Sequence, residues 1–567
     1  MSHSSLSGKE GSPNVLDAPK AVELEQQHHM QRTTQRELTS RHAIFIAWGD
    51  TVGTGLFITT GKGLARGGPA FLVGSYIVIS LLVYSILGTI VEMSTFLPVR
   101  GGSMSHYGTR FVSRSFGFAM SLLYIYSYGI LVPFELVACA IIIDFWDNPV
   151  PSAAWITVLG VLLIVLNALP VRFYGEAEFF FTGVKICTIF GLLILSFILF
   201  WGGGPHRDRL GFRYWKDPGP AKEYILEGDI GRFVAFVATL VGSALPFTFT
   251  PEMIVGTAGE IKQPRKNIPK AARHFLWRLI VAFVGSVIGI SVICPSNAEA
   301  LTAGSDAGSS PWVVGIRSAG ISGLNNVINI VVLIAAWSTG NAFLYLASRA
   351  LHTMAVEGNA PAVFKRCTSK GVPIYAVAAI SAVTPLAYMT VSSNSLEVLY
   401  WLLNLVNTGG FLSWVCCGIT YLRFRKACDV QGIPAEALTQ RSRLQPYASY
   451  VTMVVFALMC LLNGFAVFFP GWWSTGDFIS AYIGLPLIVG MYFTHRFINR
   501  GDPWAIPSHD VSLQMSQEEL DDDPLDDDPL DDDPLDDDPL DDEEEEENAS
   551  VLLTVWRRGI NMLRKRH

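Results

Sequence analysis

Two stretches of the chain place residues that interrupt a helix inside long apolar runs. The first holds Gly53 and Gly55 on either side of Thr54, and the second holds Pro246 and Pro251, which both lack the N–H that a helix needs. An interrupted helix exposes N–H groups with a partial positive charge on one half and C=O groups with a partial negative charge on the other. Two such interruptions could bind a small molecule that carries both charges, and a free amino acid fits that description.

Four ionisable side chains, Glu92, Glu135, Lys185 and Glu252, also lie within apolar runs. A charge at the centre of a membrane costs ~2.5 kcal/mol or more, so each of them is a candidate for function. Glu92 lies near the end of its run, and we expect it to reach interfacial water or Arg100. Glu135 and Glu252 are candidates for proton coupling or gating, and the alternative for both is a structural pair or a capped helix end.

Lys185 lies about ten residues into its apolar run, too deep to reach the interface. Burial disfavours the charged form of a lysine, so this side chain could release and rebind a proton. The alternative is a permanent salt bridge to Glu176, Glu178 or another acid. The chain contains no His-x-x-x-His pair, Walker loop or nucleophile elbow, so we predict neither an enzyme nor a metal site.

The composition describes the surroundings of these residues. Of the 567 residues, 50% are hydrophobic and only 16% are charged, against about 25% charged in soluble domains. The net charge of −8 conceals a basic body, because residues 518–547 hold 21 of the 49 acids and no base, which leaves 41 − 28 = +13 for the rest. A secreted disulfide scaffold, a nucleic-acid binder and a disordered chain are all excluded, and a membrane protein with many spans is predicted.

A span needs about 20 apolar residues to cross a bilayer core of ~30 Å. The two interruptions fall in the first and sixth of the segments that qualify, at matching places in two five-helix halves, 43–201 and 230–422. A glycine pair alone is more often a packing contact, but matched interruptions indicate an inverted repeat with a binding site between the halves. The predicted segments lie near residues 43–64, 72–97, 115–143, 152–170, 176–201, 230–256, 276–294, 325–352, 374–391, 396–422, 449–469 and 478–498.

Loop charges predict the orientation in the membrane. The loops on the side of the N-terminus hold eighteen Lys and Arg residues against eight on the other side, so both termini are predicted to be cytosolic. Residues 1–42 are predicted to be a disordered tail. Residues 501–567 are predicted to form a second tail, with an acidic repeat at 521–540. Its basic amphipathic end, 551–567, has the pattern of an interfacial helix, and the alternative is a disordered end that pairs loosely with the acidic run. Both tails could bind cytosolic trafficking factors.

Several motifs give the chain a resemblance to known proteins. It resembles the fungal amino-acid permeases of the amino acid, polyamine and organocation transporter superfamily, over about residues 41–500. The resemblance implies an all-α polytopic protein of about twelve helices with the leucine-transporter-type fold. Its first five-helix repeat and external loop would occupy 43–229, its second repeat 230–424 and helices 11 and 12 residues 425–500. The motifs are VGTGLF at 52–57, GGS at 101–103, YGTRF at 107–111, PFEL at 133–136, GE, PRK and IPKA within 259–271, SR at 348–349, GNAP at 358–361 and GVP at 371–373.

The resemblance also implies a mechanism and a set of ligand contacts. The chain would import amino acids with protons across the plasma membrane by alternating access, with no cofactor besides the proton, and Lys185 would stand where sodium-driven relatives hold a cation. The family usually has a small or apolar residue at Asp50 and glycine at 250–251, so substrate choice or the inner gate could differ here. The implied contacts are backbone N–H groups of Thr54 and Gly55 to the carboxylate, carbonyls of Thr51 and Val52 beside Gly53 to the amine, carbonyls of Pro246 and Phe249 opposite, and a side-chain wall from Phe247, Thr248, Phe249 and Thr250.

The substrate stays open at this point. The predicted pocket is apolar and aromatic, which favours neutral amino acids or proline, although Glu135 could recruit a cation. The alternative to a transporter is a sensor on the same fold, which would bind amino acids and signal through its tails without moving them.

Overall fold

The computed structural model describes residues 53–98, 103–146, 149–258, 268–269, 272–273, 280–301, 310–321, 323–434, 438, 440–442 and 444–513. Every structural statement below concerns these residues. The predicted contacts Thr51 and Val52, the departure at Asp50 and both predicted tails lie outside them, apart from the first residues after 500.

Helices form all the regular structure of the described residues. Eight are long and apolar enough to cross a membrane, and three shorter apolar helices accompany them. The span Gly55–Phe96 is two helices, because Gly68 has φ +80° and the chain breaks there before Pro69. With this break counted, each of the predicted membrane segments has a helical counterpart.

The bounds of the spanning elements are η2 (Gly55–Thr59) with α3 (Thr60–Phe96), α5 (Arg114–Ile143), α6 (Ser152–Ala168), α7 (Val171–Phe200), α9 (Gly228–Gly242) with η3 (Leu245–Phe247) and α10 (Thr250–Ala258), η4 (Ile280–Val284) with α12 (Gly285–Ile293), α14 (Leu324–Val356), α15 (Ile374–Ser381) with η8 (Thr384–Val391), α16 (Ser395–Val430), α17 (Tyr447–Leu462), and α18 (Thr475–Tyr482) with α19 (Gly484–Ile498). The connecting elements are α4 (Met104–Phe111), α8 (Arg213–Lys216), η5 (Glu299–Leu301), α13 (Pro311–Ser318), η7 (Ala362–Lys365) and η10 (Phe465–Phe468).

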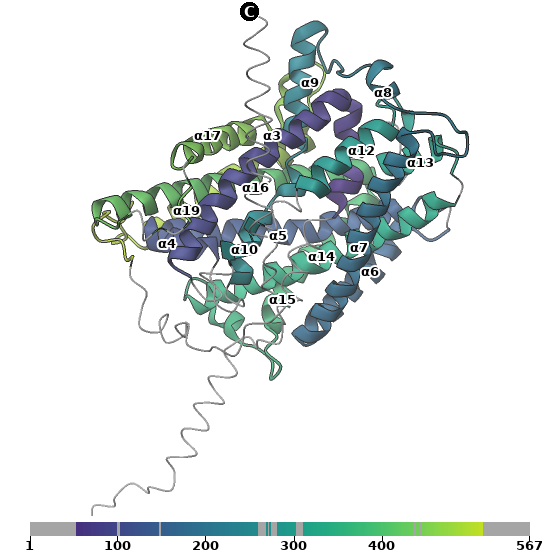
Figure 1. The fold of residues 1–567 in the computed structure, drawn as a ribbon. Coiled ribbons are helices and arrows are strands. Elements are labelled where there is room, and N and C mark those ends of the chain that lie inside the picture. Colours follow the sequence, from purple (N-terminus) through teal and green to yellow (C-terminus); the bar gives the residue numbers. More distant parts are fainter. Residues whose placement is uncertain are drawn as a thin grey trace, which may run out of the picture. The chain divides into compact units, whose positions relative to one another are not determined.

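Helix α5 forms the centre of the domain, where it packs against both α14 and α16 (Figure 1). In its most apolar stretch 89% of residues are buried, against 28% in α7. The small residues Gly117 and Ser127 let neighbours approach α5 closely, because a Cβ at Gly117 would lie 2.7 Å from Thr109 N on α4 and Ser127 lies against Gly409 on α16. Helix α7 instead exposes Phe180 and Phe197, as expected of a helix that faces lipid. The fold therefore places Glu135, on α5, at the core.

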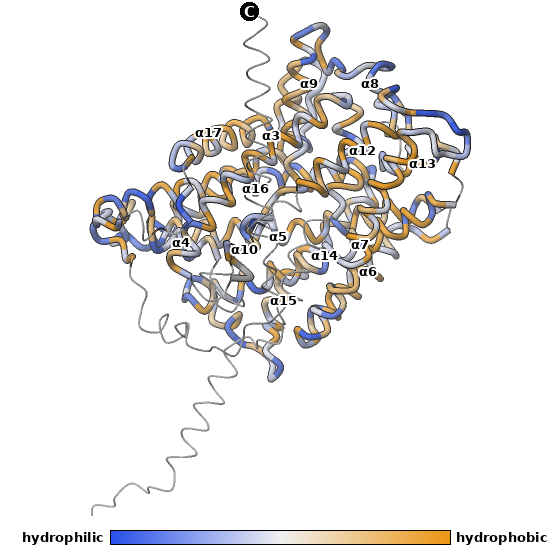
Figure 2. Tube along the Cα trace, viewed as in Figure 1, coloured by the Kyte–Doolittle hydropathy of each residue, from blue (hydrophilic) through white to orange (hydrophobic). Residues whose placement is uncertain are grey.

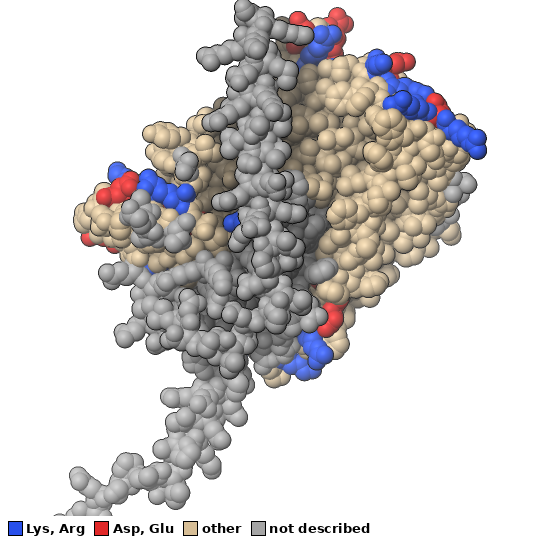
Figure 3. All heavy atoms as spheres, in the orientation of Figure 1, with Lys and Arg blue, Asp and Glu red and all other residues tan. Residues whose placement is uncertain are grey.

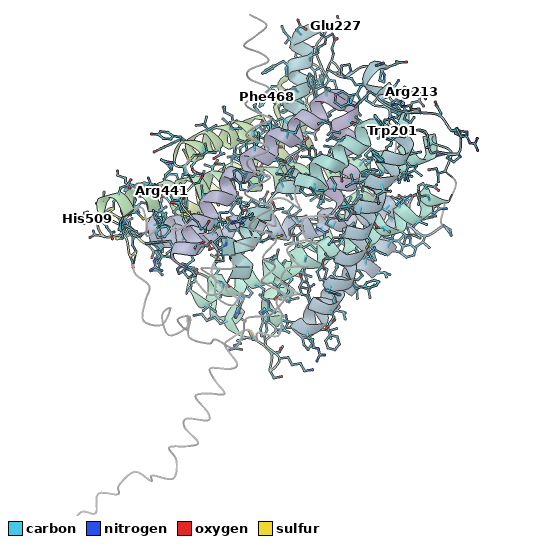
Figure 4. All side chains as sticks on the ribbon, in the orientation of Figure 1. Trp201, Arg213, Glu227, Arg441, Phe468 and His509 are labelled. Carbon is cyan, nitrogen blue, oxygen red and sulfur yellow. The ribbon has the colours of Figure 1, made fainter. Side chains whose placement is uncertain are left out.

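The exterior is that of a membrane protein. Figure 2 shows apolar residues along the flanks of the helices, and Figure 3 shows charged side chains near the helix ends, with an uncharged surface between them where grey atoms do not cover it. Figure 4 labels Trp201, Arg213 and Glu227 at one end and Arg441 and His509 at another. We call these the loop end, defined by residues 201–227, and the tail end, defined by residues 441 and 509.

The loop at 201–227 is tied to the break in α3. The Lys222 backbone N–H donates to Gly67 O at 3.1 Å, and its Nζ donates to Ala65 O at 3.2 Å. Within the loop, Arg213 donates two hydrogen bonds to Asp208, of 2.7 and 2.6 Å, and the guanidinium lowers the pKa of Asp208. The loop end is therefore ordered by contacts with the first spanning segment.

Candidate functional site

The sixth predicted segment unwinds where its prolines predict. Helix α9 ends at Gly242 and α10 begins at Thr250, with only a single 3-10 turn between them. Thr248 is extended, with φ −61° and ψ 129°, and Phe249 has φ +64°. Positive φ is rare for a bulky side chain and is often found at ligand sites. The interruption expected from Pro246 and Pro251 is confirmed.

The first segment meets this break at Gly55. The described chain begins with a bend at Gly53, and a helix starts at Thr54, so the N–H groups of its first turn point away from the helix. A Cβ at Gly55 would lie 3.1 Å from Pro246 Cγ and 3.3 Å from Pro246 Cα. A Cβ at Gly53 would lie 2.8 Å from Thr339 Oγ1 on α14. The glycines therefore permit a close approach of the first segment to both the sixth and α14.

A buried cavity lies where these elements meet, and we call it the central cavity. Its volume is about 30 Å³, roughly the room that two water molecules need. An amino acid would enter only when the walls move apart. The lining residues are Gly53, Gly55, Leu131, Phe134, Glu135, Leu245, Pro246, Thr248, Thr339 and Phe343.

The structure thus brings together Gly53, Gly55, Pro246, Thr248 and Glu135 from the predicted set. The sequence analysis missed the contributions of α5 and α14, namely Leu131, Phe134, Thr339 and Phe343. Phe134 belongs to the PFEL motif at 133–136, but no local signal marks it or the other three residues as part of a cavity wall. The helical spacing of Leu131 and Phe134 from Glu135 could have suggested a shared face with that acid.

Three predicted residues of the side-chain wall do not line the cavity in this structure. The Phe247 ring packs against Phe283, with ring centroids 4.8 Å apart, and the Phe249 ring packs against Tyr128 at 5.0 Å. Thr250 Oγ1 donates to Phe247 O at 2.7 Å. Their predicted contacts with a ligand stay predictions.

Glu135 connects α5 to the first segment. Its side chain is buried, and its carboxylate accepts a hydrogen bond from the hydroxyl of Thr54, which is buried as well. The acid therefore sits on the cavity wall beside the start of the broken helix. A carboxylate in this place can attract the amine of an incoming amino acid or hold a proton.

Lys185 reaches across from α7 to α14. Its Nζ donates to Thr339 Oγ1 at 3.1 Å and lies 3.7 Å from Glu178 Oε1, and both charged side chains are fully buried. Glu178 also accepts a hydrogen bond from Ser338, at 2.8 Å. The salt bridge that the sequence analysis kept as an alternative is thus present with Glu178. Lys185 is still connected to the central cavity despite its ion pair with Glu178, because Thr339, which accepts its hydrogen bond, also lines that cavity.

Glu252 lies in the first turn of α10, where the helix dipole favours a carboxylate. It is buried, and its Oε1 accepts a hydrogen bond from Ser413 Oγ at 2.9 Å. It does not line the central cavity. Its predicted role in gating stays a prediction, and its position between α10 and α16 suits a contact that changes when these helices move.

The expectation that Glu92 reaches interfacial water was wrong. Its side chain is only 1% exposed and pairs with Arg425 Nη1 at 2.7 Å, while Tyr421 donates to it at 2.7 Å. Helix α16 extends to Val430, beyond the predicted end at 422, and so carries Arg425 alongside Glu92. Arg100, the expected partner, lies outside the described residues. In the described part of the chain, no group of three His, Cys, Asp or Glu side chains could hold a metal.

An all-helical membrane domain with a buried cavity between the break in the sixth segment and the start of the first described helix is typical of the leucine-transporter type of fold. The fold is similar to a crystal structure of a manganese transporter from Eremococcus coleocola, with a TM-score of 0.51, 13% identity and coverage of 82% of this chain and 98% of the other. The family described as amino acid permease matches residues 42–503, so the chain belongs to the amino acid permease family. It is a secondary transporter of amino acids and not an enzyme.

Two relatives are similar over most of their length. A proline-specific permease of Emericella nidulans is 42% identical over 508 residues, which cover 89% of this chain and 92% of the relative. A proline-specific permease of Saccharomyces cerevisiae is 41% identical, over 86% of this chain and 79% of the relative. The predicted family and fold class are therefore confirmed.

Proposed function

We propose that this permease imports L-proline together with protons. The observation that carries the choice of substrate is the wall of the central cavity, where Leu131, Phe134 and Phe343 are apolar and Glu135 is the charged residue. A small apolar ring fits such a wall, and a charged side chain would find no partner of its own there. The similarity to two permeases named as proline-specific supports the same choice.

The ligand backbone would bind at the two breaks. The carboxylate of proline would accept hydrogen bonds from the N–H groups of Thr54 and Gly55, at the positive end of a helix. Its ammonium would lie near Glu135 and the carbonyls of Thr51, Val52 and Pro246. Proline carries one N–H fewer than other amino acids, so fewer acceptors satisfy it.

The proton would be coupled to transport through Lys185. Substrate at the first break would press on Gly53 and Thr339, and Thr339 accepts the hydrogen bond of Lys185. A movement of the first segment away from α14 would change the surroundings of the Lys185 ammonium and the strength of its ion pair with Glu178. Glu135 and Glu252 are the alternative proton carriers.

The protein would reside in the plasma membrane with both tails in the cytosol. The excess of Lys and Arg in the loops on the N-terminal side supports this orientation. The loop end would then face the outside, so substrate would reach the central cavity from that end, and the walls would open alternately to either side.

Counterflow of radiolabelled proline in liposomes tests the proposal. We expect unlabelled proline inside the vesicles to drive accumulation of labelled proline. When the vesicles contain no proline, an alkaline interior should drive net uptake of labelled proline. Unlabelled amino acids added outside should compete with labelled proline according to how well their side chains fit the central cavity, and unlabelled proline should be the strongest competitor. Proline binding without counterflow would instead identify a sensor, and counterflow of other amino acids but not proline would refute the substrate.

A further inference from the structure

A column of polar side chains leads away from Lys185 between α6, α7 and α14, which pack against one another (Figure 1). Its first member is Glu178, two turns before Lys185 on α7, with Oε1 3.7 Å from the ammonium. Ser338, on α14, donates to the same Oε1 at 2.8 Å. Glu178 does not line the central cavity, so the column starts behind the site and not within it.

Two buried asparagines continue the column. Asn341, on α14, is fully buried and lies beside Glu178. Its Oδ1 accepts a hydrogen bond of 2.8 Å from Asn167 Nδ2 on α6, and Asn167 is only 6% exposed. Amide groups are costly to bury among apolar helices, so a pair of them at this depth is a candidate for function.

The column ends in a small cavity, which we call the inner cavity. Its volume is about 10 Å³, roughly the room that one water molecule needs. Asn167 lines it together with Tyr174, Ser348 and Arg349. Tyr174 lies in the first turn of α7, whereas Trp201 of the loop end follows its last residue, so about 40 Å separate the two. The inner cavity therefore lies toward the side opposite to the loop end, which is the cytosolic side in the proposed orientation.

Three atoms along the column have no hydrogen-bond partner within the described residues. They are Glu178 Oε2, Asn341 Nδ2 and Asn167 Oδ1. Buried polar atoms are rarely left unsatisfied, and ordered water is a common partner for them. A carboxylate followed by amide groups and water can pass a proton from one group to the next. The column thus has the chemistry of a proton path.

The ionisable groups around the column favour one direction of transfer. Glu135, on α5, also attracts the Lys185 ammonium, but it lines the central cavity. The neighbouring α6 and α12 carry no ionisable side chain. Glu178 is therefore the carboxylate next to Lys185 on the side away from the substrate. The ionisable side chains beyond Glu178, toward the inner cavity, are Arg172, Tyr174 and Glu176 on α7 and Tyr345, Arg349 and His352 on α14.

We infer that the proton carried by Lys185 leaves through Glu178, Asn341 and Asn167 to the inner cavity, on a route separate from that of the substrate. The ammonium donates to Thr339 and turns to Glu178 when the first segment moves. An N–H bond of Lys185 then breaks and an O–H bond of Glu178 forms, which leaves a neutral amine and a neutral acid. Glu178 passes this proton to water in the column and becomes a carboxylate again. The inference rests on the proposed coupling through Lys185 and adds an exit for its proton.

Two variants test this exit in liposomes, each by proline uptake driven by an alkaline interior and by proline counterflow at equal pH. Glu178→Gln removes the proton acceptor, and Asn167→Leu fills the column with an apolar side chain of similar size. In both we expect gradient-driven uptake to fall about tenfold or more, with counterflow within about threefold of the wild type. Asn167→Ser keeps a polar group and leaves room for water, so its gradient-driven uptake should stay within about threefold of the wild type.

Asn329→Leu is the matched control. Asn329 is also a buried asparagine of α14 with an unsatisfied amide within the described residues, but it lies about three turns before Thr339, away from the inner cavity. Its replacement should change both activities equally. Gradient-driven uptake at the wild-type rate in Glu178→Gln or Asn167→Leu, or a parallel loss of both activities in the two, would overturn the exit. Where one variant loses counterflow as well, the other decides by the same criterion. A wild-type protein indifferent to the pH gradient would instead contradict the proposed coupling itself.

Discussion

Lys185 on α7 and Thr339 on α14 are joined by a hydrogen bond of 3.1 Å, and Thr339 forms part of the wall of the central cavity. The same threonine limits how close a side chain at Gly53 could come, since a Cβ there would lie 2.8 Å from its hydroxyl. One residue thus touches both the substrate break and the buried ammonium. We propose that this contact couples the ligand to the proton.

Thr339→Val should impair that coupling, because valine keeps the shape of threonine but removes the acceptor for Lys185. We expect uptake driven by a pH gradient to fall about tenfold or more, the effect of losing a hydrogen bond to a charged group. Counterflow at equal pH should change less than about threefold. Thr339→Ser restores the hydroxyl and should restore gradient-driven uptake, and an equal loss of both activities in Thr339→Val would contradict the coupling role.

Gly55→Val should weaken proline binding at least about tenfold, because a side chain at this position must displace the backbone of Pro246. Gly55→Ala should have a smaller effect, since Pro246 needs to move by only a few tenths of an ångström to admit its Cβ. Binding is measured by dialysis and folding by Tm in detergent. Gly74→Val is the control, because a Cβ at Gly74 meets nothing within 4 Å. Normal proline binding by Gly55→Val would exclude the first break as the carboxylate site.

The buried pair of Glu92 and Arg425 predicts a stability effect without a substrate effect. Removing one partner, as in Arg425→Leu, should destabilise the protein by about 3–5 kcal/mol, because it leaves a buried charge unpaired. The double variant Glu92→Leu with Arg425→Leu should recover much of that loss. Thermal unfolding in detergent measures both, and a double variant less stable than Arg425→Leu would show that the pair is not the cause.

The sequence predicted the spans and the break in the sixth segment because their signals are local. Pro246, Pro251 and the glycines around Thr54 disturb the backbone wherever they occur in a helix, and long apolar runs need no partner to be recognised. Glu178 could be predicted as a candidate partner of Lys185 because it lies two turns earlier on the same helix. Arg425 could not be predicted as the partner of Glu92, because the two meet only through the packing of α16 on α3 and the exact end of α16 decided the pair. The apolar wall from α5 and α14 depends on tertiary packing as well.

The acidic repeat within residues 518–547 should be dispensable for transport itself. It contains no base and no apolar cluster, so we expect no packing against the membrane domain. The full chain is compared with a deletion of 518–547 by proline uptake per molecule at the cell surface. We expect less than about a twofold difference, although surface abundance itself can change. A large drop in uptake per molecule would contradict this prediction.

The most direct test of proton-coupled proline transport compares two assays in wild-type and Lys185→Ala liposomes. The first measures proline uptake driven by an alkaline interior, and the second measures proline counterflow at equal pH on both sides. We expect both activities in the wild type, and in Lys185→Ala a loss of gradient-driven uptake with counterflow retained. Gradient-driven uptake at the wild-type rate in Lys185→Ala, or a wild-type protein indifferent to the pH gradient, would contradict proton coupling through Lys185.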